Sequence, residues 1–217
     1  MARHGGIRAG RWPVQLRFET GLTGEEYVNR QAWREASLAQ CPVHPGGGCS
    51  MARHGTYERL QPPGARIPRW YCPEGHRTFS LLPDCLAVKL SGTLCAVEQA
   101  VVAVEQANSV EAAADELRPD IELPGALRWL RRRVKSVRRA LITLRGLMPE
   151  RFSGGGPATL SAWRVHLDCD CVLLALRAIA AAYLPCLPPP LGFRPLRCPS
   201  GEHRKALQHK VGPDPPG

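Results

Sequence analysis

The sequence predicts an α+β fold that is mostly α, with a small β module followed by a helical bundle. Cysteines and histidines gather in two groups between Cys41 and His76, and short strand-like stretches surround the second group. From Leu94 onward, apolar residues repeat at the three- and four-residue spacing of amphipathic helices. The longest of these repeats lies in a strongly basic segment, residues 124–151.

The two groups contain five candidate metal ligands. The first group is Cys41, His44 and Cys49, and the second is Cys72 and His76. Zinc takes four ligands in a tetrahedron, from thiolate sulfur and imidazole nitrogen. One tight turn supplies only part of that sphere, so a second turn must supply the rest. We therefore expect one zinc ion here, with Cys49 competing against either histidine for a place among the four ligands.

Two short strands are predicted beside the second group, at residues 66–71 and 78–82. Pro68 has no N–H to donate, so we expect the first of them to lie at the edge of its sheet. Two ligand turns and short strands around one metal ion form a zinc-ribbon-like module, which we place at residues 41–90.

Three motifs in this module resemble the zinc ribbon at the front of many bacterial transposases and related mobile-element proteins. They are Arg-His-Gly-x-Tyr-x-Arg at 53–59, an aromatic-Cys pair at 71–72, and Arg-Thr-Phe-Ser-Leu-Leu-Pro at 77–83. They are also similar to a domain of unknown function built on the same plan. The resemblance implies a zinc ribbon and transposase-like ancestry.

The chain departs from the family pattern at both turns. The usual pattern is Cys-Pro-x-Cys early and Cys-x-x-Cys-Gly-x-Thr-Phe-Ser late. Here His44 stands in place of the second cysteine, and Gly75 stands in place of the last one. His76, directly after Gly75, is the candidate to replace the missing thiolate, because Cys-x-x-x-His spacing can close on zinc. The alternative is a metal-free ribbon held together by Trp70, Phe79 and their apolar neighbours.

Composition limits the function classes. The chain has 217 residues, a formal net charge of +10 and nine cysteines. No apolar run at the N-terminus is long enough for a signal peptide, and no run of 18 uncharged apolar residues occurs anywhere. We therefore expect a cytoplasmic protein with no membrane association, whose cysteines are reduced thiols or metal ligands.

Three helices are predicted in residues 91–152. Thr93 caps the first helix, Ser109 begins a short second one, and Pro124 opens the third. The third helix, residues 124–148, contains an unbroken apolar seam: Leu127, Leu130, Val134, Val137, Leu141, Leu144 and Met148. Such a seam is expected to bury against other helices.

The segment 124–151, which includes the third helix, contains nine lysines and arginines and one acidic residue, and this favours a polyanionic partner. Its sequence Ala-Leu-Arg-Trp-Leu-Arg-Arg-Arg-Val at 126–134 resembles the helix-turn-helix that follows the ribbon in some transposases. The resemblance implies that this helix enters the major groove of DNA. The candidate base-reading residues are Arg128, Arg131 and Arg132, and the candidate phosphate-binding residues are Arg133, Lys135, Arg138 and Arg139.

The remaining segments have no counterpart in the resemblance. Residues 1–40 form a lead-in segment with a predicted helix at 24–36, and residues 153–157 form a Gly-rich linker. Residues 157–186 are predicted as one long helix or two abutting helices that pack on the bundle, and residues 187–217 as a disordered tail.

No catalytic motif is present: the sequence lacks G-x-S-x-G, P-loop and H-E-x-x-H patterns. We therefore expect no catalytic activity and no small-molecule substrate. Together with the basic helix and the zinc-ribbon-like module, this predicts a DNA-binding accessory or regulatory protein of transposase-like ancestry. Two alternatives remain. One is a protein–protein interaction module that binds a partner, or a second copy as a homodimer, through the seam of helix 124–148. The other is a truncated transposase remnant.

Overall fold

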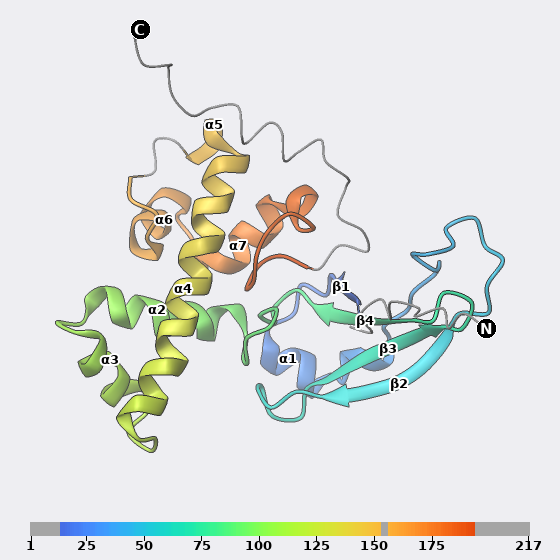
Figure 1. Cartoon of the computed structure of the whole chain (residues 1–217), viewed down its shortest axis with the longest axis horizontal. Helices are drawn as coiled ribbons and strands as arrows, with labels where there is room; N and C mark the ends of the chain where they lie inside the picture. The colour runs from blue at the N-terminus through green and yellow to red at the C-terminus, as the bar shows by residue number, and fades with distance from the viewer. Residues whose placement is uncertain (1–13, 153–155, 194–217) are drawn as a thin grey trace, which may run out of the picture.

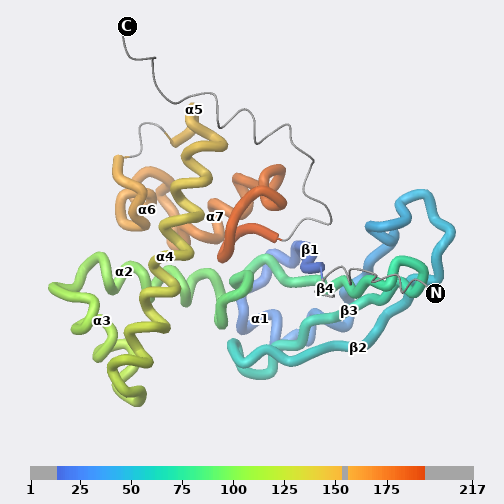
Figure 2. The backbone as a smooth tube through the Cα atoms, viewed as in Figure 1, coloured from blue at the N-terminus to red at the C-terminus, as the bar shows by residue number. Residues whose placement is uncertain are grey.

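The computed structural model describes residues 14–152 and 156–193, which form a sheet module joined to a helical bundle (Figure 1). The described residues contain one four-stranded sheet and seven α-helices, so the mixed α+β fold is confirmed. Figure 2 shows that the segment after the last strand leads directly into the bundle. Among these residues, no helix combines the length and the apolar character needed to cross a membrane.

The sheet has the strand order β1-β4-β3-β2. The strands are β1 (Val14–Phe18), β2 (Ala52–Glu58), β3 (Arg66–Cys72) and β4 (Arg77–Pro83). β1 pairs parallel with β4, whereas β3 pairs antiparallel with both β4 and β2. The predicted lead-in segment is therefore not separate from the ribbon, because β1 forms an edge of the same sheet.

β3 is an internal strand, which corrects the edge position predicted from Pro68. Pairing with β4 begins only at Arg69, opposite Ser80, whereas pairing with β2 already includes Pro68, opposite Thr56. Pro68 therefore lies where β3 has a neighbour on one side only. The missing N–H is tolerated there because the β4 ladder has not yet begun.

The predicted helix at 24–36 is interrupted. Its parts are α1 (Gly24–Asn29) and a short 3-10 helix, η1 (Ala32–Arg34). Thr23 and Glu26 form a capping box that fixes the start of α1. The chain then turns at Gln31, whose φ is 51°. This turn brings buried Trp33 to within 5.7 Å of the ring of Tyr27, so both aromatic residues join one small core.

The elements of the bundle are α2 (Leu94–Gln106), α3 (Val110–Leu117), α4 (Leu123–Leu147), α5 (Pro149–Phe152), α6 (Leu160–Leu167), α7 (Val172–Ile179) and the 3-10 helix η2 (Ala181–Tyr183). In the bundle, α3, α4, α6 and α7 all contact α2, its first helix. The predicted caps are present, because Thr93 and Ser109 accept backbone N–H groups in the first turns of α2 and α3. The segment after the Gly-rich linker forms two helices rather than one.

Two carboxylates of α2 hold the N-terminal ends of α6 and α7. Glu98, which is buried, accepts the N–H of Leu173 at 2.8 Å, and Glu105 accepts the N–H groups of Leu160 and Ser161 at 3.0 Å each. A negative charge is favourable at the N-terminus of a helix, where backbone N–H groups have no helical partner. α6 and α7 have only eight residues each, so these contacts help to fix them on α2.

The apolar seam of α4 is buried by the chain itself. Leu130, Val137, Leu141 and Leu144 are fully covered, whereas Leu127, Val134 and Met148 are half-buried. The main core continues from Val137, Leu141 and Leu144 to Ile67 of β3. A partner or a second copy would therefore have to displace the chain's own helices to reach the seam.

The predicted disordered tail begins too early, because residues 187–193 are packed. Leu187, Leu191 and Phe193 are buried in the main core. Apolar side chains spaced along this proline-rich stretch fill the space beside α7, which composition alone did not indicate. The rest of the predicted tail, residues 194–217, lies outside the described residues.

Arg177 of α7 joins three parts of the structure. Its guanidinium is fully buried and donates to the carbonyl oxygens of Asp84 and Leu86 at 2.7 Å each, of Leu191 at 3.1 Å, and of Pro190. Burial lowers the pKa of Arg177, but four carbonyl partners stabilise the charged form. One side chain thus connects the end of the sheet, the bundle and the last packed segment.

We expect Arg177→Ala to lower the free energy of unfolding by about 3 kcal/mol or more, because four carbonyl groups each lose a hydrogen bond from the buried guanidinium and a cavity remains. Urea unfolding followed by tryptophan fluorescence measures this. The control is Arg128→Ala at an exposed position of α4, which should change stability by about 0.5 kcal/mol or less. Similar small effects for both variants would contradict the role of Arg177.

Candidate metal centre

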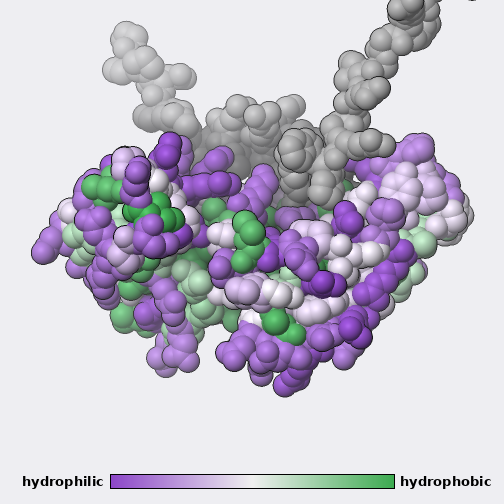
Figure 3. All heavy atoms as spheres, turned by 90° about the horizontal axis from the view of Figure 1, so that it is seen from below, coloured by the Kyte–Doolittle hydropathy of each residue, from purple (hydrophilic) through white to green (hydrophobic). Residues whose placement is uncertain are grey.

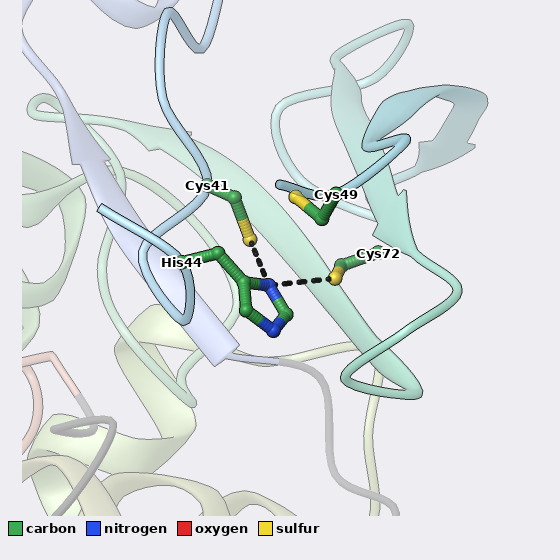
Figure 4. Close-up of side chains that lie close together, drawn as sticks. All are labelled: Cys41, His44, Cys49 and Cys72. Carbon is green, nitrogen blue, oxygen red and sulfur yellow. Dashed lines mark hydrogen bonds between the residues drawn. The ribbon is translucent and has the colours of Figure 1, made fainter. Parts of the chain in front are cut away.

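Four of the five predicted ligands converge. The sulfur atoms of Cys41, Cys49 and Cys72 and a ring nitrogen of His44 all lie within 4.8 Å of one another. Figure 4 shows the four side chains facing one another, three from the loop 41–49 and one from the end of β3. This group could bind a metal ion, as the sequence predicted for these four residues.

Two of the distances between ligand atoms match the edges of a zinc tetrahedron. His44 Nδ1 lies 3.4 Å from Cys72 Sγ and 3.6 Å from Cys41 Sγ. Zinc–sulfur and zinc–nitrogen bonds of the usual lengths give a sulfur–nitrogen edge of about 3.5 Å in a tetrahedron. Three thiol sulfurs and one imidazole are a donor set that structural zinc sites use.

Tight turns bring the first three ligands together. The N–H of His44 donates to the carbonyl of Cys41 at 3.0 Å, and the N–H of Gly47 donates to that of His44 at 3.0 Å. Gly47 and Gly48 then take φ angles of 86° and 80°, which favour glycine. These turns fold the loop back, so that Cys49 reaches the group.

His76 is not part of the group. It is exposed in the turn after β3, with a φ of 45°, and its Nδ1 lies 3.4 Å from the hydroxyl oxygen of Tyr71. Cys49, not His76, therefore joins the other three residues. Gly75, which stands where the family pattern has its last cysteine, faces the group: a Cβ there would lie 3.4 Å from Cys72 Sγ and 3.5 Å from His44 Cε1. The thiol missing from this position is replaced by Cys49 from the other loop.

The protein environment acts differently on two of the thiols. Burial raises the pKa of Cys41, but hydrogen bonds from the backbone of Val43 and from His44 outweigh it and bring the pKa to about 7. Burial raises the pKa of Cys72 to about 11, although the N–H of Gly75 donates to its sulfur at 3.3 Å. Zinc requires thiolates, so its binding releases protons from this group.

Glu74 connects the two ligand-bearing turns, a role that sequence reasoning missed. Its carboxylate accepts the N–H of Ser50 at 3.0 Å and the hydroxyl of Ser50 at 2.7 Å. These hydrogen bonds lower the pKa of Glu74 to about 2, so it stays ionised. Ser50 directly follows Cys49, and Glu74 lies two residues after Cys72. No local pattern could reveal a contact between residues so far apart in the sequence.

The predicted DNA-binding residues, with one exception, lie exposed on α4. They are Arg128, Arg131, Arg132, Lys135, Arg138 and Arg139. Two of them have partners within the chain: Arg131 lies 3.4 Å from a carboxylate oxygen of Glu111, and Arg132 donates to the carbonyl of Lys89 at 3.2 Å.

Arg133 is the exception, and its predicted phosphate contact is wrong. Its side chain is buried, lies 3.7 Å above the ring of Trp129 and donates to the carbonyl and hydroxyl oxygens of Ser91 at 3.1 and 3.0 Å. Burial lowers its pKa to about 10. The guanidinium holds the start of α2 against α4 and cannot reach a phosphate.

Comparison of the chain with protein-family models, with curated proteins and with solved structures gives no match in any of the three. The transposase-like resemblance of its motifs therefore stays a prediction.

Purified protein is expected to contain one zinc ion per chain, measured by plasma mass spectrometry. Cys49→Ser and Cys72→Ser should each lower the zinc content severalfold, because each removes one of only four ligands. His76→Ala is the matched control, and it should retain the full zinc content. Loss of zinc in His76→Ala with retention in Cys49→Ser would contradict the assigned ligand set.

Glu74→Ala is expected to weaken zinc affinity about tenfold, because residues that orient metal ligands typically contribute by that factor or more. Competition with a chromophoric chelator measures the affinity. Ser50→Ala should weaken it in the same direction, and the double variant should add little to Glu74→Ala because both changes break one contact. Fully additive losses would show that Glu74 acts in another way.

Proposed function

We propose that the protein is a non-catalytic DNA-binding protein that docks on duplex DNA through the exposed face of α4, with a structural zinc ion in its sheet module. The observation that supports this most directly is the concentration of exposed cations on one face of a single helix. Arg128, Arg132, Lys135 and Arg139 recur at intervals of four, three and four residues. They form a stripe about 16 Å long, which suits contacts to several successive phosphates.

Three of these cations have no ion-pair or hydrogen-bond partner among the described residues: Arg128, Lys135 and Arg139. Exposed charges that the chain does not neutralise are available to a polyanion. Phosphate contacts of this kind position a protein on DNA and give affinity that depends strongly on salt.

The zinc site favours a structural rather than a catalytic role. A zinc ion bound there would have four protein ligands, which would leave no position for water or substrate. The site also lies at the end of the sheet away from the bundle (Figure 1). We therefore assign DNA docking to α4 and assign to zinc the folding of the loop 41–50 against β3.

Neither the seam of α4 nor the face drawn in Figure 3 favours docking through an apolar surface of the described residues. The apolar seam of α4 is covered by the chain's own helices. On the face drawn in Figure 3, hydrophilic residues predominate and hydrophobic residues form separate groups. For this reason we prefer DNA to a protein partner bound through the seam.

Binding of a duplex oligonucleotide should weaken with salt, with a log–log slope of about −5 if six phosphates are neutralised. The triple variant Arg128→Ala, Lys135→Ala, Arg139→Ala should bind about tenfold or more weakly and should have a slope smaller in magnitude by about 2 to 3. Fluorescence anisotropy at several salt concentrations measures both quantities.

The matched control removes the same charge from the sheet module: Arg30→Ala, Arg34→Ala, Arg66→Ala, all at exposed positions. It should keep most of the affinity. An equal loss in both triple variants would mean that net charge, and not the face of α4, attracts DNA. Binding that does not respond to salt would contradict the proposed function itself.

A further inference from the structure

The turn that connects β4 to α2 exposes one lysine beside α4. In the stretch from Leu81 to Leu90, every residue is buried except Lys89, which is exposed. Its neighbours Val88 and Leu90 are only 2% and 5% exposed, and both belong to the main core. The chain therefore leaves the core at this position and returns to it at the next residue.

Lys89 has a backbone conformation that residues with a Cβ atom rarely adopt. Its φ is 58°, in the left-handed region that glycine favours. The Cβ atom makes this conformation unfavourable for a lysine, so the surrounding structure must impose it. Glycine or asparagine would adopt it more easily. The shape of the turn therefore does not explain why a lysine stands here, and a role of the side chain does.

Hydrogen bonds fix the backbone on both sides of Lys89. Arg59 donates to the carbonyl oxygens of Ala87 at 3.0 Å and of Leu90 at 2.7 Å. The N–H of Ala87 donates to the carbonyl oxygen of Gly92 at 3.1 Å, which closes the turn. The backbone of Lys89 is thus held in one place, and its side chain extends from a fixed point.

The turn is also bound directly to the basic helix. Arg132 donates to the carbonyl oxygen of Lys89 at 3.2 Å, and Arg133 donates to the carbonyl and hydroxyl oxygens of Ser91 at 3.1 and 3.0 Å. Arg132 belongs to the exposed stripe of α4 described above. Lys89 therefore lies beside this stripe, although 43 positions separate it from Arg132 in the sequence.

The charge of Lys89 is not neutralised by the described part of the chain. Its ammonium group has no ion-pair or hydrogen-bond partner among these residues. Because Lys89 belongs to a separate segment, it widens the line of cations on α4 into a patch. Such a concentration of like charges attracts a polyanion.

We propose that Lys89 is a further phosphate-binding residue, which contacts the DNA backbone beside the phosphates that α4 contacts. This inference rests on the proposed function, because it concerns the same bound duplex. The ammonium group is a compact charge that suits a phosphate oxygen and does not read the base sequence. Since the contact lies off the axis of α4, it orients the helix on the duplex and adds affinity.

Lys89→Asn tests the contact, because asparagine removes the charge and tolerates the positive φ. Binding to a duplex oligonucleotide should weaken about fivefold at about 0.1 M salt, and the log–log salt slope should fall in magnitude by about 1. The loss should be equal on two duplexes of unrelated sequence. Lys89→Arg retains the charge and should bind within about twofold of the unaltered protein. Fluorescence anisotropy measures all of these quantities.

Two further variants separate the contact from effects on folding and on net charge. Lys89→Gly removes the same charge where φ suits glycine, so it should bind as weakly as Lys89→Asn. The midpoint of thermal unfolding should stay within about 2 °C in both. Arg34→Asn removes one charge from an exposed position of the sheet module, and it should keep its affinity within about twofold.

The outcomes distinguish this inference from the proposed function. Unchanged affinity and slope in Lys89→Asn, together with weak binding by the triple variant of α4, would overturn the role of Lys89 alone. An equal loss in Lys89→Asn and Arg34→Asn would assign the effect to net charge and would also overturn it. Absence of salt-dependent binding by the unaltered protein would overturn both proposals.

Discussion

The buried guanidinium of Arg177 is the contact on which the arrangement of the two modules depends. A charge in a core is tolerated only when enough polar groups surround it, and here backbone carbonyls from two separate segments do so. The segment after β4 and the segment around Pro190 contain no helix or strand of their own, so their carbonyl groups need donors from elsewhere. The guanidinium of Arg177 donates to carbonyl oxygens of both segments, and this holds the sheet, α7 and the last packed residues in one core.

A buried charge needs polar partners, and this also explains why most arginines of α4 are exposed while Arg133 is buried. The apolar seam of the helix faces the core, so most of the cations face solvent and are available to a polyanion. Arg133 lies at the boundary between the two faces. There the carbonyl and hydroxyl oxygens of Ser91 and the ring of Trp129 surround its guanidinium. A basic helix therefore has both exposed arginines and a structural, buried one, and packing decides which is which.

At the candidate metal centre, the sequence indicated which residue types would bind a metal ion, but not which four of the five candidate residues would come together. Spacing alone left Cys49 and His76 as competitors. Two consecutive glycines with positive φ fold the first loop back, so that Cys49 enters the group, while His76 remains beside Tyr71. Glu74 illustrates the same limit: its contact with Ser50 joins two turns that are neighbours only after the sheet has formed.

The sequence by itself determined the local features: the caps at Thr93 and Ser109, the seam of α4, and the strands on either side of Cys72. Each of these depends on residues within a few positions of one another, so periodicity and spacing suffice. The tertiary structure alone decided the internal place of β3 and the burial of Arg133 and Arg177. These depend on contacts between segments that are distant in the sequence, and such contacts are set by how the whole chain packs.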